Sequence, residues 1–177
     1  LTKARIMLAH GDQLRAEGTD DEASLRSEAA NQYRTAIQQL QKAQAQDKTG
    51  QIIQQCRYLT GVGHLKLGDV RAAEQAFERT RRLHFHTPEA LAASLYEAEI
   101  QQTQGRHDVA LTTFLDALAE VGDPQTYRNP WVSLAAFSDR LLAAHKKFRE
   151  ADQFEEALQL SHAAQETLPM DEMLQAE

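Results

Sequence analysis

Apolar residues recur every three or four positions along most of the chain, and this spacing predicts α-helices. Between residues 70 and 83 the recurring positions form one stripe: Val70, Ala73, Ala76, Phe77, Thr80 and Leu83. Two later stripes have the same spacing: Ala110, Phe114, Ala117, Leu118 and Val121, then Phe154, Ala157, Leu158, Ala164 and Leu168. Such a stripe lies on one face of a helix, where it packs against a neighbouring element. No segment shows the period of two that is typical of a half-buried strand, so we expect no sheet.

Prolines and glycines mark where the predicted helices begin and end. Thr87 before Pro88, and Asn129 before Pro130, each resemble an N-cap residue followed by a proline in the first helical turn. Five glycines stand where the helical periodicity stops, as expected of residues that adopt the left-handed conformation: Gly18, Gly50, Gly68, Gly105 and Gly122. These boundaries predict helices near 2–17, 20–47, 51–67, 70–84, 88–104, 107–121, 130–150 and 154–168.

An internal repeat becomes apparent when the predicted helix pairs are aligned. The clearest unit has a small residue, Gly61, in the middle of its first helix, a turn at Gly68-Asp69, and the small and aromatic pair Ala73 and Phe77 in its second helix. The other units repeat parts of this pattern: Ala29, Tyr33 and Ala36; Ala98, Gly105, Ala110, Phe114 and Ala117; Phe154, Ala157, Ala164 and Pro169. The pattern resembles the tetratricopeptide repeat, most specifically in the two middle units. The resemblance implies an all-α, right-handed solenoid of antiparallel helix pairs, in about four repeats.

The units differ in length from those of the family they resemble. A tetratricopeptide repeat has about 34 residues, whereas the equivalent alanines are 44, 37 and 47 residues apart: Ala29, Ala73, Ala110 and Ala157. We therefore expect some helices to be long, especially 20–47 and 130–150. In the last unit His145 occupies a position that is normally small, and Ser161 occupies the aromatic one. Moving the register by one residue places Ala144 at the small position, and both registers are kept open.

Composition and charge narrow the classes of protein. The 177 residues are 42% hydrophobic and 25% charged, values near globular averages. We expect one helical-repeat domain over residues 1–177, with pairs near 2–47, 51–84, 88–121 and 130–168. A net charge of −7 argues against general nucleic-acid binding, and no apolar run approaches the roughly 20 residues of a transmembrane segment. Since the sequence starts at Leu1 and ends in what resembles the start of a helix, we expect it to be a segment of a larger protein.

Few residues suggest catalysis or metal binding. His84 and His86 stand close together, but neither a cysteine nor a metal-binding His-Glu motif accompanies them, so a role in the connection is favoured over a metal site. Cys56 lies among apolar residues of a predicted helix, where a buried thiol is favoured over a nucleophile. Gly61 and Gly63 lack the preceding strand and the further glycines of a phosphate-binding loop. We expect no enzymatic activity, no metal and no cofactor.

A basic cluster lies on the predicted helix 70–84 and consists of Arg71, Arg79, Arg81 and Arg82. Such a cluster suits an acidic partner. Glu74 and Glu78 interleave with it, however, and Glu78 and Arg82 are spaced as an i,i+4 ion pair. A solvated, salt-bridged face is therefore favoured over a site for an acidic ligand.

The family resemblance also implies a candidate binding surface. In tetratricopeptide repeats the first helix of each pair lines a concave groove, and ten residues are expected to face it: Tyr58, Val62, Leu65, Lys66, Leu95, Glu99, Gln102, Leu142, Lys146 and Arg149. Tyr58, Leu65 and Leu95 are candidate anchors for an extended or helical peptide. The alternative is that some of them belong to the core between helices.

A helical repeat without a catalytic constellation predicts a non-catalytic interaction scaffold. Its expected partner is a peptide or a protein bound through the groove, an expectation that rests on analogy with the family. The alternative is a structural spacer or a self-association module, because the end surfaces of a helical stack need to be covered. The two predictions differ in the oligomeric state, which light scattering measures.

Overall fold

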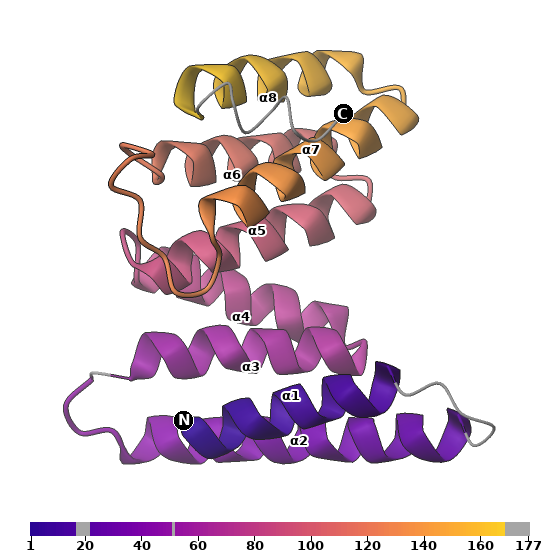
Figure 1. Cartoon of the computed structure of the whole chain (residues 1–177), viewed down its shortest axis with the longest axis vertical. Coiled ribbons are helices and arrows are strands. Elements are labelled where there is room, and N and C mark those ends of the chain that lie inside the picture. Colours follow the sequence, from indigo (N-terminus) through magenta and orange to yellow (C-terminus); the bar gives the residue numbers. More distant parts are fainter. Residues whose placement is uncertain (17–21, 51, 169–177) are drawn as a thin grey trace. The chain divides into compact units, whose positions relative to one another are not determined.

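The computed structural model of the chain describes residues 1–16, 22–50 and 52–168, and these residues form eight helices and no strand (Figure 1). The helices are α1 (Thr2–Ala16), α2 (Glu22–Gln46), α3 (Ile53–Leu67), α4 (Val70–Leu83), α5 (Pro88–Thr103), α6 (His107–Ala119), α7 (Leu134–Glu150) and α8 (Phe154–Thr167). The all-α prediction is confirmed. The predicted helix ends at residues 17, 20 and 51, together with Gly18 and Pro169, lie outside the described residues.

The chain divides into two compact units, residues 1–80 and residues 81–177. In the first unit α1 packs antiparallel to α2, and α2 also contacts α3. In the second unit α5 pairs with α6 and α7 with α8, while further contacts join α5 to α7 and α6 to α8. Antiparallel helix pairs are therefore confirmed within each unit. A single domain and the right-handed path of the whole stack stay predictions.

Small residues opposite aromatic rings allow paired helices to approach closely. Gly61 in α3 lies against the ring of Phe77 in α4, so that a Cβ atom at this glycine would stand 2.6 Å from Cε1 of the ring. Phe77 is fully buried, as is Phe114 at the equivalent place in α6. Ala73 and Ala110, the small residues of the same two helices, are also fully buried. The predicted function of these positions as packing residues is confirmed.

Four residues of the predicted apolar stripes are exposed instead of buried. Val70 and Leu83 are 38% and 58% exposed because they are the first and last residues of α4. Phe154 and Leu158 of α8 are 62% and 59% exposed. A stripe defined by spacing alone is longer and wider than the part of a helix that a neighbour covers, so some of its residues remain in contact with solvent.

The connection between α6 and α7 differs from the prediction. Asn129 was expected to cap a helix that begins at Pro130, but α7 begins at Leu134 and is capped by Ser133, whose Oγ accepts a hydrogen bond from the amide of Ala136. The Asn129 side chain instead accepts bonds from two following amides within the connection. The prediction of a long helix over residues 130–150 is thus wrong. The additional residues of this unit instead lie in the connection between α6 and α7. The long α2, of 25 residues, agrees with the prediction.

The glycine and proline signals are otherwise accurate. Thr87 caps α5 by accepting a hydrogen bond from the amide of Ala90, with Pro88 in the first turn. Gly68 ends α3 with a φ of 80°, and its amide donates to the carbonyl of Leu65. A side chain other than glycine would be strained in this left-handed conformation. Gly105 has a φ of 76° in the corresponding turn of the next pair.

The register of the last unit follows from burial. Ala144 is 2% exposed, whereas His145 is only partly buried. Leu160 is 1% exposed and takes the large apolar position beside the partly buried Ser161. Of the two registers that the sequence left open, the structure has the one with Ala144 at the small position.

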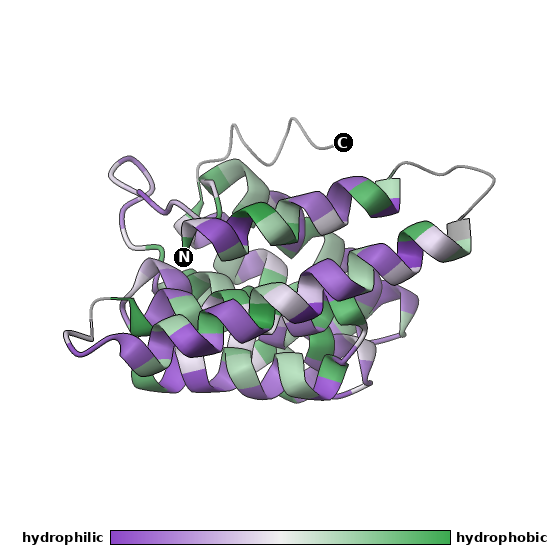
Figure 2. Cartoon of the chain, turned by 90° about the horizontal axis from the view of Figure 1, so that it is seen from below, coloured by the Kyte–Doolittle hydropathy of each residue, from purple (hydrophilic) through white to green (hydrophobic). Residues whose placement is uncertain are grey.

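Polar and apolar residues alternate in bands along the helices, as Figure 2 shows in purple and green. Consistent with these bands, the structure contains no helix, within its described ranges, whose length and hydropathy suit a membrane span. Most helices have one face suited to packing and another suited to solvent, whereas α5 is buried on nearly all sides.

Candidate functional site

Three of the ten predicted groove residues belong to the core. Leu95 is completely buried, and Tyr58 and Gln102 are 5% and 4% exposed. The Tyr58 ring lies 6.2 Å from the ring of Phe77, and the Gln102 amide donates a hydrogen bond of 2.8 Å to the carbonyl of Ala144. Tyr58 and Leu95 were candidate peptide anchors, and the structure corrects this because their side chains fill the space between helices.

Two further predicted residues are engaged in links between helices. Glu99 of α5 accepts two hydrogen bonds from the guanidinium of Arg140 in α7, of 2.6 and 2.8 Å. The same guanidinium lies 4.1 Å from the centre of the Tyr96 ring. Lys66 of α3 pairs with Asp12 of α1 at 2.5 Å. These charges hold neighbouring helices together within each unit.

Val62 and Leu65 complete the predicted set on α3, and both are partly buried. Leu65 keeps part of its side chain accessible, so its role as a peptide anchor stays a prediction. The remaining three predicted residues, on α7, differ from all of these.

Leu142, Lys146 and Arg149 are exposed and line one open depression, which we call the α7 depression. Its volume is about 920 Å³, and its other lining residues are Asp139, Ala143, His145, Glu150 and Phe154. All of these except Phe154, the first residue of α8, belong to α7. The structure therefore brings the three predicted residues of the last unit together on a single accessible surface.

The sequence prediction missed five lining residues, although a signal for three of them existed. Positions 139, 142, 143, 146, 149 and 150 recur at helical spacing, which places them along one face of α7. Phe154 had no such signal, because its spacing assigned it to a buried stripe. Its ring reaches the depression only because the turn after α7 reverses the chain direction.

The imidazole of His145 lies in the α7 depression beside two cations. Burial lowers its pKa from 6.5, and the charge of Arg149 lowers it further. Since the unfolded chain then binds a proton more readily than the folded chain, the free energy of unfolding falls as the pH drops through 6.5. Above that value the neutral imidazole is present in both states.

We expect His145→Gln to weaken the pH dependence of stability. The measurement is urea unfolding between neutral pH and about pH 5. The difference between the two proteins isolates His145 from groups common to both. Hydrogen bonds from Ile52 and Thr49 lower the pKa of Asp47 from 3.8. The stability that Asp47 contributes is therefore lost only at a more acid pH than the one at which His145 gains a proton. Parallel curves for the two proteins would contradict the prediction.

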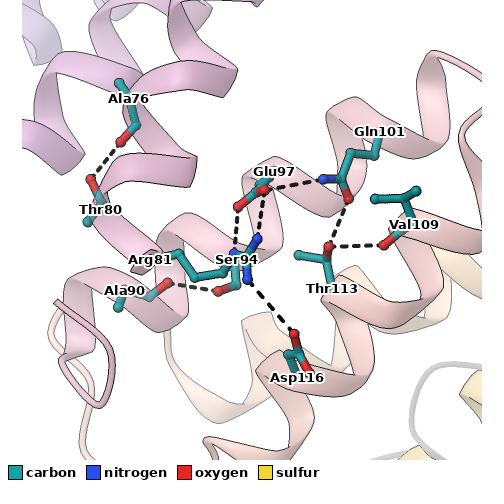
Figure 3. A network of polar contacts seen from close by, with 10 residues as sticks. All are labelled: Ala76, Thr80, Arg81, Ala90, Ser94, Glu97, Gln101, Val109, Thr113 and Asp116. Atoms are coloured by element: carbon teal, nitrogen blue, oxygen red, sulfur yellow. Dashed lines mark hydrogen bonds and ion pairs between the residues drawn. The ribbon is translucent and has the colours of Figure 1, made fainter. Parts of the chain in front are cut away.

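A polar network inside the second unit links Arg81 and α6 to the buried face of α5 (Figure 3). Glu97, 2% exposed, accepts hydrogen bonds of 2.8 and 3.0 Å from Arg81 and one of 3.2 Å from Gln101. Thr113 of α6 donates to Gln101 at 2.9 Å, and Arg81 also lies 3.9 Å from Asp116. Arg81, part of the predicted basic cluster, is thus salt-bridged, as the favoured interpretation had it.

Two of the residues considered for metal binding and catalysis, His86 and Cys56, lie in a contact between side chains and in the core, respectively. In the part of the chain that the structure describes, no group of three or more His, Cys, Asp or Glu side chains is arranged to hold a metal ion. His86 contacts Glu120, with 2.8 Å between Nδ1 and Oε2. Cys56 is completely buried, as predicted, and burial raises the pKa of its thiol. A buried protonated thiol is a poor nucleophile.

Comparison with known families gives one match. The family model described as tetratricopeptide repeat matches residues 58–125. This range covers most of α3, all of α4 to α6, and the start of the following connection, which are the two middle pairs where the repeat pattern is clearest. No curated protein matches the chain.

Proposed function

Because the chain belongs, through residues 58–125, to the tetratricopeptide repeat family, we propose that it is a non-catalytic scaffold that binds a peptide or protein through the α7 depression. Repeats of this family generally mediate protein–protein interactions. The observation that carries the proposal is the meeting of Leu142, Lys146 and Arg149 on one exposed face. These three are the predicted groove residues that are exposed to solvent.

The chemistry of the α7 depression indicates an amphipathic partner segment. Leu142 and Phe154 are 40% and 62% exposed and offer apolar surface for an anchor side chain. Lys146 and Arg149 provide positive charge, and Lys146 lies 3.8 Å from Glu150. An apolar side chain flanked by acidic residues complements this arrangement. The volume of about 920 Å³ lies in the range of ligand sites.

We expect Leu142→Asp to weaken partner binding by more than about tenfold, because the substitution places a charge where the anchor packs. The measurement is calorimetry with a peptide selected by display against the intact chain. Leu158→Asp is the matched control, since Leu158 is an exposed leucine of α8 that does not line the depression. Equal losses in both variants, or no loss in either, would remove the α7 depression from the proposal.

Self-association is a second candidate function, and the exposure of Leu158 favours it. With Phe154 it forms an apolar i,i+4 pair on α8, at 59% and 62% exposure. A second copy of the chain would cover such a pair. Light scattering over a concentration series decides: a dimer that Leu158→Asp dissociates supports self-association, and a monomer at all concentrations excludes it.

A further inference from the structure

A second pocket lies in the first unit, between α2, α3 and α4, and we call it the α3 pocket. Its volume is about 300 Å³. Gln41 and Gln44 contribute amides from α2, Thr60 and His64 contribute a hydroxyl and an imidazole from α3, and Arg79 contributes a guanidinium from α4. Polar groups from three helices thus converge on one small volume, a feature that helix packing alone does not require.

Two buried polar atoms of this pocket have no hydrogen-bond partner among the described residues. They are Oγ1 of Thr60 and Nδ1 of His64. The closest carboxylate oxygen to Nδ1 is that of Asp69 at 3.5 Å, which is too long for a good hydrogen bond. The other oxygen of Asp69 is engaged with the amide of Ala72 at the start of α4. Burial of unpaired polar atoms is unfavourable, so a ligand that pairs with these two atoms would be stabilising.

The charge of the pocket defines the ligand. Arg57 and Arg79 both line it, and none of its described lining residues is acidic. Arg79 makes no ion pair with any described residue, in contrast to Arg81 two positions later. Residues 1–80 contain eleven Lys and Arg against ten Asp and Glu, whereas residues 81–177 contain eight against sixteen. The α3 pocket therefore lies in the less acidic part of the chain.

We propose that the α3 pocket binds a small organic molecule that carries a carboxylate. The guanidinium of Arg79 pairs with the carboxylate, a geometry that arginine forms readily with two parallel hydrogen bonds. The Thr60 hydroxyl donates to the same group, and so does His64 when its Nδ1 carries the proton. The glutamine amides interact with the rest of the molecule. A volume of about 300 Å³ suits a small metabolite and exceeds what a bare ion fills.

The proposed site is independent of the scaffold function. It involves none of the residues of the α7 depression, and it lies in the other compact unit. Of the four arginines in the basic cluster, only Arg79 lines the α3 pocket. The variant Leu142→Asp should accordingly leave ligand binding at the α3 pocket unchanged.

The test is a titration of the intact chain with succinate at constant ionic strength, followed by NMR shifts of the Thr60 and His64 amides. We expect saturable shifts that Arg79→Gln weakens by about tenfold, because one charge-assisted contact is lost. Arg71→Gln is the matched control, as Arg71 is an exposed arginine of α4 that does not line the pocket. Thr60→Val should also weaken binding while the chain remains folded.

Two other ligands and the control variant test the proposal further. Neutral succinamide should cause no saturable shift, and equal binding of it would exclude recognition of the carboxylate. Inorganic phosphate that binds as tightly as succinate would show that the pocket selects charge and not a carboxylate. Shifts that fail to saturate, or that respond equally to Arg71→Gln and Arg79→Gln, would exclude the site.

Discussion

Phe114→Ala is expected to lower the free energy of unfolding of the second unit by about 3–5 kcal/mol. The Phe114 ring is completely buried in α6, and it meets the ring of Phe148 in α7 edge to face, with 6.4 Å between centroids. Alanine removes this contact and leaves a cavity between the α5–α6 pair and the α7–α8 pair. The rigid helices around the site limit how far the cavity can collapse, so the loss should be large.

Urea unfolding followed by the fluorescence of Trp131 measures this change, because the single tryptophan of the chain lies in the same unit. Phe85→Ala is the matched control. The Phe85 side chain is 66% exposed in the same unit, so its loss should change stability by less than about 0.5 kcal/mol. Similar effects of the two substitutions would contradict the assignment of Phe114 as a central packing residue.

Glu97→Ala is expected to have the second large effect, a loss of about 3 kcal/mol. The Glu97 side chain is only 3% exposed and pairs with Arg81, whose side chain is 30% exposed. The substitution leaves the guanidinium in a partly buried place without its buried partner, although Asp116 still lies 3.9 Å away. The partial exposure of Arg81 lets water solvate it in part, which places the expected loss at the lower end of values for broken buried pairs.

A double-mutant cycle distinguishes the charge interaction from lost packing. Arg81→Leu alone should also destabilise the unit, because it leaves the carboxylate of Glu97 buried without its cation. The double variant Arg81→Leu with Glu97→Leu should recover much of the loss, since no buried charge remains. Additive effects of the two single substitutions would show that the ion pair makes no specific contribution.

Much of the fold was predictable because it depends on local patterns. The stripe from Ala110 to Val121 is buried throughout, with no residue more than 7% exposed. The cap at Thr87 and the left-handed turn at Gly68 also agree with the sequence. These features arise from helical periodicity and from backbone preferences within a few residues, which a sequence contains directly.

The candidate site was less predictable. Leu95 and Leu142 were assigned to the same groove, yet one is completely buried and the other is 40% exposed. Both are leucines on the first helix of a pair, so local pattern does not separate them. The difference depends on which helices are packed against each position, and such contacts join residues that are distant in sequence.

Local patterns in the sequence are enough to establish a series of paired helices with small and aromatic residues at their contacts. Periodicity, caps and the repeat spacing are sufficient for this. Packing between helices places Asn129 in a connection and Ala144 at the small position, and it selects the polar side chains that line the α3 pocket. These outcomes depend on burial and on partners supplied by other helices, whose free energies exceed the local preferences of any one segment.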